Sequence, residues 1–269
     1  MRNARNDIRI RRMTLLKTLL VQARLDWKQP ERNRARLEAL LDETPGPFDL
    51  AVFPETFTTG FLGDEASTDE GMDGPTASWM KKMAARHSCA FAGSVVITEN
   101  GRRFNRLLFV TPDGDVGHYD KRHLFAFGGE NQRYTAGGRR VNLDYLGWRI
   151  NLQVCYDLRF PAWCRNRGDY DLMLLVANWP AKRIRHWSSL LEARAIENQS
   201  FVIGLNRVGE DGNGIEYPGR SVVYDPQGQC LADLGSAEEC RLVELDLSAV
   251  SRTRTDFPFQ ADADRFEIL

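Results

Sequence analysis

Residues 148–160, WRINLQVCYDLRF, combine an apolar, β-rich run with an abrupt polar end. A strand with one exposed face alternates apolar and polar residues, whereas a continuous run is typical of a strand that is covered on both faces. Similar β-rich runs recur along the chain, at 15–22, 49–54, 89–98, 171–178 and 200–208, and several of them are nearly continuous. The sequence therefore predicts sheets that are buried on both sides.

Segments with helical periodicity lie between these runs. Residues 29–43, 74–88 and 186–199 each place apolar side chains on one side and charged side chains on the other. The turns PDG at 112–114 and PQG at 226–228 predict antiparallel hairpins. The chain shows no repeat and no linker rich in Pro, Gly and Ser. The pattern predicts an α/β fold with mixed sheets and outer helices.

The composition of the 269 residues is that of an ordinary globular protein. A formal net charge of −1 provides no field for holding nucleic acid or an anionic membrane, and no apolar run has the length of a membrane span. The five cysteines form no CxxC pair, and the four histidines lack zinc-ligand spacing. We therefore expect a reducing, cytoplasmic setting, no disulfide framework, no metal and no cofactor.

The first twelve residues, MRNARNDIRIRR, carry five arginines and no apolar pattern. Together with the following MTLLKTLLVQA they could form a presequence, but Lys17 interrupts the apolar run and no small-residue cleavage site follows. We expect a disordered extension over 1–12 and a single domain over 13–269.

Three polar residues directly follow apolar, strand-like runs: Glu55, Lys121 and Cys155. Taken singly, each has a structural explanation: Glu55 as a surface carboxylate, Lys121 as a solvated loop charge and Cys155 as a packing cysteine. Together they meet the needs of a thiol nucleophile, because a thiol requires a base, and a buried carboxylate beside it can act as one. The lysine and the backbone N–H of Tyr156 would stabilise the negative charge that develops on an attacked amide oxygen. The set predicts a base, an oxyanion stabiliser and a nucleophile.

The motifs FPETFTTGF, YDKRHLF and CYDLRFP, in this order and spacing, resemble the Glu–Lys–Cys signature of the nitrilase, or carbon–nitrogen hydrolase, superfamily. The resemblance covers residues 14–247 and is closest, in YDKRHLF and ANWPAKR, to the omega-amidase branch, which hydrolyses amides of dicarboxylates such as 2-oxoglutaramate. It implies that Glu55 is the general base, Lys121 the oxyanion-stabilising cation and Cys155 the nucleophile. Glu130 in FAFGGENQRY matches a further glutamate that orients the lysine and the substrate amide. The resemblance also implies a four-layer αββα sandwich with two mixed sheets, and a homodimer or higher homo-oligomer.

An omega-amidase must recognise a carboxylate beyond the scissile amide, and the planar fork of an arginine suits that task. Arg183 and Arg185, just after ANWP, are the candidates, although each could equally be a solvated charge at a helix start. Other residues expected to contribute to substrate binding are Tyr156, Asn178 and Trp179 in the pocket wall, with His186 and Tyr134 as helpers of the arginine.

The turn after Cys155 carries two further charged residues, Asp157 and Arg159, which we expect to pair and hold it, while Cys164 packs in a short helix. Three functions stay open at this point. The first is an amidase that forms a thioester on Cys155 and releases ammonia from a small-molecule amide. The second is a nitrilase or a carbamoyl-amide hydrolase with the same residues. The third is a scaffold without activity, against which the intact set of Glu55, Lys121 and Cys155 argues.

Overall fold

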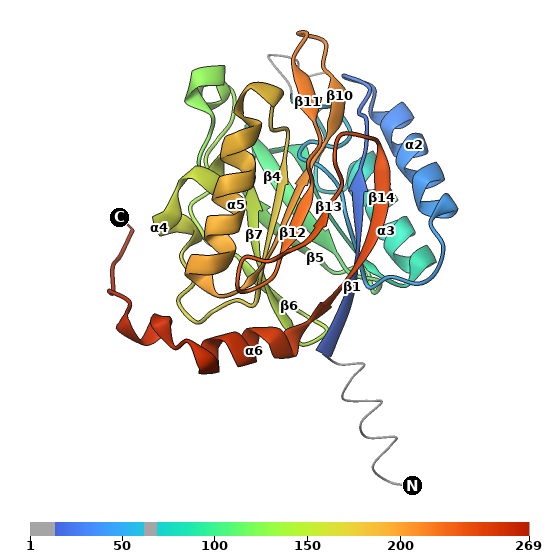
Figure 1. Ribbon diagram of the computed structural model, residues 1–269. Coiled ribbons are helices and arrows are strands. Elements are labelled where there is room, and N and C mark those ends of the chain that lie inside the picture. The colour runs from blue at the N-terminus through green and yellow to red at the C-terminus, as the bar shows by residue number, and fades with distance from the viewer. Residues whose placement is uncertain (1–13, 62–68, 269) are drawn as a thin grey trace, which may run out of the picture.

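The computed structural model describes residues 14–61 and 69–268 (Figure 1). The extension expected over 1–12 lies outside these residues. Among the helices of the described residues, none combines the length and hydropathy that crossing a bilayer requires.

The first large sheet has six strands in the order β14-β1-β2-β3-β4-β5. It is mixed, because β2 pairs in parallel with β1 and β3, whereas the outer pairs are antiparallel. The strands are β1 (Leu15–Gln22), β2 (Leu50–Val52), β3 (Ala90–Glu99), β4 (Arg102–Val110), β5 (Val116–Asp120) and β14 (Glu239–Asp246). The hairpin predicted at the PDG turn is confirmed as β4–β5.

The second large sheet also has six strands, in the order β13-β12-β9-β8-β7-β6. Its central strands β7, β8 and β9 are parallel and its outer pairs are antiparallel. The strands are β6 (Asn142–Tyr145), β7 (Trp148–Val154), β8 (Leu172–Ala177), β9 (Phe201–Asn206), β12 (Val222–Tyr224) and β13 (Cys230–Asp233). The PQG turn joins β12 and β13, as predicted. A separate hairpin, β10 (Val208–Glu210) and β11 (Glu216–Pro218), extends beyond this sheet (Figure 1).

The two large sheets pack face to face, with helices on both outer faces (Figure 1). Apolar side chains of both sheets, among them Leu20, Leu107, Leu152 and Val176, form one buried cluster between them. Helices α2 (Pro30–Glu43) and α3 (Pro75–His87) pack on the first sheet, and α5 (Ile184–Asn198) and the short α4 (Pro161–Cys164) pack on the second. Helix α6 (Leu247–Asp256) follows β14. The predicted αββα sandwich with two mixed sheets is confirmed.

The continuous apolar runs are explained by this layering, because all residues of β8 and β9 are buried between a helix layer and the opposite sheet. Both helices on the first sheet begin with a proline, which lacks the N–H that the first turn would leave unpaired. The polar residues that follow β2, β5, β7 and β8 then meet at one end of the sandwich.

Candidate active site

Cys155 lies at the sharp turn between β7 and the short 3-10 helix η4 (Cys155–Arg159). Its φ of 45° is in the left-handed region, which residues with a Cβ rarely occupy, so the turn depends on its surroundings to hold it. Because η4 begins here, the N–H of Tyr156 has no acceptor within its own helix. The turn presents a thiol and a backbone N–H at the wall of a cavity of about 230 Å³.

The buried carboxylate of Asp157 holds this turn. Its Oδ2 accepts hydrogen bonds from the N–H of Val154 at 3.1 Å and from the hydroxyl of Tyr119 at 2.8 Å. Its Oδ1 accepts one from the N–H of His123 at 2.9 Å and lies 2.8 Å from His123 Nδ1. Since Tyr119 and His123 flank Lys121 in the sequence, Asp157 ties the lysine segment to the cysteine turn.

The predicted pair between Asp157 and Arg159 is wrong. Arg159 lines the cavity, where its guanidinium lies 4.8 Å over the ring of Trp179 and its Nη2 lies 3.2 Å from His186 Nδ1. A 3-10 helix has three residues per turn, so side chains two residues apart point in different directions. One of the two residues therefore faces the protein interior and the other faces the cavity.

Glu55 follows β2 and is fully buried. Its Oε1 accepts a hydrogen bond from Lys121 Nζ at 2.8 Å, and its Oε2 accepts one from the N–H of Asn178 at 2.8 Å. The side-chain Nδ2 of Asn178 donates to the backbone oxygen of Glu55 at 2.9 Å. Asn178, at the end of β8, thus clamps both the carboxylate and the backbone of Glu55.

Lys121 follows β5 and lies between two carboxylates. Its Nζ donates to Glu130 Oε1 and Oε2 at 3.0 and 2.9 Å, in addition to its bond with Glu55. Glu130 also accepts a 2.6 Å hydrogen bond from the N–H of Phe125, which fixes the loop between them. Glu130 is buried behind Lys121 and is not among the residues that line the cavity. From this position Glu130 can orient Lys121, as predicted. It does not reach the cavity, where the predicted contact with a substrate amide would have to form.

The charges of the cluster set its resting protonation state. Burial raises the pKa of the Cys155 thiol well above its usual range, the Glu55 carboxylate raises it further, and Lys121 opposes both. Burial alone lowers the pKa of Lys121, but the carboxylates of Glu130 and Glu55 outweigh it and hold that pKa well above its usual range. Near neutral pH the site therefore holds a neutral thiol beside an ammonium group, and this thiol could act as a nucleophile only by losing its proton.

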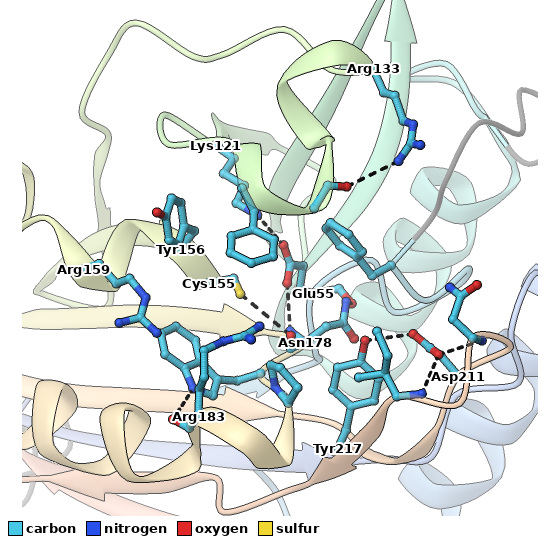
Figure 2. A pocket seen from close by; sticks show the side chains of 17 residues that line it. Glu55, Lys121, Arg133, Cys155, Tyr156, Arg159, Asn178, Arg183, Asp211 and Tyr217 are labelled. Atoms are coloured by element: carbon cyan, nitrogen blue, oxygen red, sulfur yellow. Dashed lines mark hydrogen bonds and ion pairs between the residues drawn. The ribbon is translucent and has the colours of Figure 1, made fainter.

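The cavity wall combines aromatic with charged side chains, and its basic groups are Lys121, Arg133, Arg159 and Arg183. Figure 2 shows Arg159 and Arg183 on one side of the thiol, and Asp211 and Tyr217 of the β10–β11 hairpin on the other. Burial lowers the pKa of Arg159, and the charge of Arg183 lowers it further, so the two like charges lie close enough to repel each other. The lining also includes Phe61, Phe125, Tyr156, Trp179, Pro180 and Ile215.

Residues 18–255 match the sequence model of the family described as carbon-nitrogen hydrolase. The chain belongs to the carbon–nitrogen hydrolase family. It is 44% identical over 254 residues to omega-amidase YafV of Escherichia coli (strain K12). The alignment covers 94% of this chain and 98% of the relative. It is 34% identical over 245 residues to 2-oxoglutaramate amidase of Bacillus subtilis (strain 168), with 88% and 93% covered.

A solved structure is similar over nearly its full length. XC1258 from Xanthomonas campestris is a CN-hydrolase superfamily protein whose crystal structure contains an arsenic adduct in the active site. It superposes with a TM-score of 0.92 at 46% sequence identity, over 94% of this chain and 99% of that chain. The resemblance to this superfamily and to its omega-amidase branch is therefore confirmed, and the protein is a carbon–nitrogen hydrolase.

The structure of this hydrolase brings together some of the predicted substrate-binding residues and separates others. Those that line the cavity with Glu55, Lys121 and Cys155 are Tyr156, Asn178, Trp179 and Arg183. Arg185 is exposed and does not line the cavity. His186 does not line it either, but it contacts Arg159, which does. Tyr134 packs against Val96, with the guanidinium of Arg103 5.8 Å from its ring centroid, and does not line the cavity either.

Several lining residues were missed from the sequence. Arg159 was assigned to the turn, and the available signal was its position four residues after the cysteine, in the same short helix. The hairpin residues Asp211 and Tyr217, which are joined by a 3.0 Å hydrogen bond, had no local signal that linked them to the site. Within residues 14–61 and 69–268, no group of three or more His, Cys, Asp or Glu side chains is arranged to hold a metal ion.

Proposed function

We propose that this hydrolase cleaves the terminal amide of dicarboxylic acid monoamides such as 2-oxoglutaramate, through a thioester on Cys155 and with release of ammonia. The observation that carries the proposal is the pair of guanidinium groups, Arg159 and Arg183, on the wall of the cavity that contains the thiol. Two cations beside a nucleophile fit a substrate with a carboxylate at one end and an amide at the other. The names of the relatives, omega-amidase and 2-oxoglutaramate amidase, support the same substrate class.

Acylation begins with the neutral thiol of Cys155 and the carboxylate of Glu55. As the sulfur adds to the amide carbon, Glu55 takes the thiol proton. The carbonyl oxygen becomes an oxyanion, which Lys121 Nζ and the N–H of Tyr156 stabilise. Lys121 keeps its proton throughout, because two carboxylates hold it in the charged form.

The tetrahedral intermediate then loses its nitrogen. Glu55 returns the proton to that nitrogen, the carbon–nitrogen bond breaks, and ammonia leaves behind a thioester on Cys155. In the second half of the reaction Glu55 takes a proton from a water molecule, whose oxygen adds to the thioester carbon. Collapse of this intermediate breaks the carbon–sulfur bond, returns the proton to sulfur and releases the new carboxylic acid.

The distal carboxylate of the substrate is bound by Arg159 and Arg183. The Trp179 ring 4.8 Å below Arg159 and the Phe125 ring 5.3 Å from Arg183 restrict both guanidinium groups, which reduces the entropy lost on binding. A nitrile or a carbamoyl amide could react at the same thiol, but neither accounts for the two arginines unless it also carries a carboxylate.

The decisive measurement is steady-state ammonia release from 2-oxoglutaramate, compared with glutamine, a simple nitrile and an N-carbamoyl amino acid. We expect 2-oxoglutaramate to give the highest kcat/KM. Glutamine carries an ammonium group next to its carboxylate, which would lie near the two arginines. Faster turnover of the nitrile or the carbamoyl compound would replace the omega-amidase assignment, and no turnover of any of them would favour the scaffold. The homodimer and the cytoplasmic location stay predictions.

A further inference from the structure

Asn105 lies in β4 and contacts three members of the catalytic cluster, although the proposed mechanism assigns it no role. It is buried, and its backbone oxygen accepts the N–H of Lys121 at 3.0 Å. Its side-chain Nδ2 donates to Glu55 Oε1 at 2.7 Å and to Glu130 Oε1 at 3.3 Å. One residue thus holds the lysine backbone and both carboxylates.

The hydrogen bonds on Glu55 are unevenly divided between its two oxygens. Oε1 accepts from Asn105 Nδ2 and from Lys121 Nζ, which occupies both of its lone-pair positions. Oε2 accepts only the N–H of Asn178 among the described residues and keeps one position open. Because a proton needs a free lone pair, the thiol proton of Cys155 can be received only at Oε2.

We propose that Asn105 is a positioning residue that makes Oε2 of Glu55 the oxygen that receives the Cys155 proton. It does so by filling the second acceptor position of Oε1 and by keeping the carboxylate from rotating. The proposal rests on the thiol mechanism above and is independent of which amide is the substrate.

The orientation of the Asn105 amide supports this role. Its Oδ1 is buried and accepts no hydrogen bond from the described residues. Turning the amide round would aim an acceptor at two carboxylates. The side chain therefore leaves one acceptor unpaired in order to donate to Glu55 and Glu130, an arrangement that costs stability.

The charge balance of the cluster gives Asn105 a second effect. Two carboxylates and one ammonium leave an excess negative charge in a buried site, and each hydrogen bond donated to a carboxylate favours its charged form. The titratable groups that face Glu55 are Lys121, Glu130, Cys155 and, at longer range, Tyr217. None of the others replaces the Asn105 donor, so its removal leaves the negative charge of the cluster with one hydrogen-bond donor fewer.

The test compares Asn105→Leu, which removes both polar atoms at similar size, with Asn105→Ser, which keeps a single donor. The first readout is the rate at which iodoacetamide alkylates Cys155, followed by mass spectrometry from pH 5 to 9. This reaction also requires Glu55 to take the thiol proton, yet it needs no substrate. The second readout is kcat and KM for 2-oxoglutaramate.

We expect Asn105→Leu to lower kcat by about 10²-fold with little change in KM, since a base that is present but misdirected loses much of its contribution. The rate of Cys155 alkylation should fall as well, since the same proton transfer to Glu55 accompanies that reaction. In both readouts Asn105→Ser should lie between wild type and Asn105→Leu. If Asn105→Leu does not fold, Asn105→Ser alone tests the role of Asn105 in the two readouts.

The matched control is Asn151→Leu, the same change at a fully buried asparagine of β7 that bonds to Asn142 and does not line the cavity. Unchanged alkylation in a folded Asn105 variant would overturn the proposal, and so would equal losses in the Asn105 and Asn151 variants. If wild type is alkylated normally but does not hydrolyse 2-oxoglutaramate, the substrate assignment fails and the role of Asn105 stands.

Discussion

Replacing the arginines of the cavity should separate substrate recognition from chemistry. We take Arg159→Met and Arg183→Met, which keep the side-chain length and remove the charge. The substrates are succinamate, with a free carboxylate, and its methyl ester, which keeps the amide and masks that carboxylate. In wild type, kcat/KM should be higher for the acid, because only the acid can accept charge-assisted hydrogen bonds from the guanidinium groups.

The size of the effect follows from the two anchors. A hydrogen bond to a charged group contributes about 1.5–3 kcal/mol, and about 1.4 kcal/mol corresponds to a tenfold change in kcat/KM. Loss of one arginine should therefore lower kcat/KM for the acid by about 10- to 150-fold. Because the charge of Arg183 lowers the pKa of Arg159, the two guanidinium groups interact, and the single losses should not add to the loss in the double variant. The ester should lose little with either change.

The assay is ammonia release, with Arg185→Met as the matched control, since Arg185 is two residues from Arg183 but exposed outside the cavity. We expect this control to behave as wild type with both substrates. If wild type hydrolyses acid and ester equally well, the omega-amidase assignment falls and a general amidase takes its place. If the discrimination survives in the double variant, the carboxylate anchor lies elsewhere. Equal losses in Arg185→Met would point to the general field of the protein and not to a binding contact.

Three further predictions concern the cluster and its support. A stoichiometric thiol reagent should give a single fast adduct at Cys155, measured by mass spectrometry, and none at the fully buried Cys164; a first adduct at Cys164 would contradict the nucleophile assignment. Asp157→Asn should lower the free energy of unfolding by about 1–3 kcal/mol and also lower kcat, because an amide cannot accept from all four donors around it; denaturant unfolding and kinetics that match wild type would refute this. Burial raises the pKa of Cys164 from 9.0 to about 12. The unfolded thiol loses its proton first, so the stability contributed by the neutral thiol is complete below pH 9 and is lost as the pH rises toward 12. Unfolding of Cys164→Ala should depend less steeply on pH in this window than that of wild type, and identical slopes would show that the thiol is not protected.

The sequence determined the layers and indicated the proposed reacting groups. The apolar run at 172–177 is a local pattern, and a continuous run of this kind is typical of a strand covered on both faces wherever it lies in the fold. Glu55, Lys121 and Cys155 were recognisable because each follows a strand-like segment, and their chemistry is complementary. The apolar runs and the complementary side chains can both be recognised from the sequence, since strand burial and the reactivity of a side chain depend on residue type and near neighbours.

Only the tertiary structure decided how side chains point at the site. Arg159 and Arg185 are both arginines beside a motif, yet the η4 turn brings the first into the cavity and the start of α5 keeps the second outside. Asn105 stands 50 residues after Glu55, and the pairing of β3 with β2 and β4 brings the two within 2.7 Å. The direction of a side chain depends on turn geometry and sheet register, and both are set by packing between segments that are distant in the sequence.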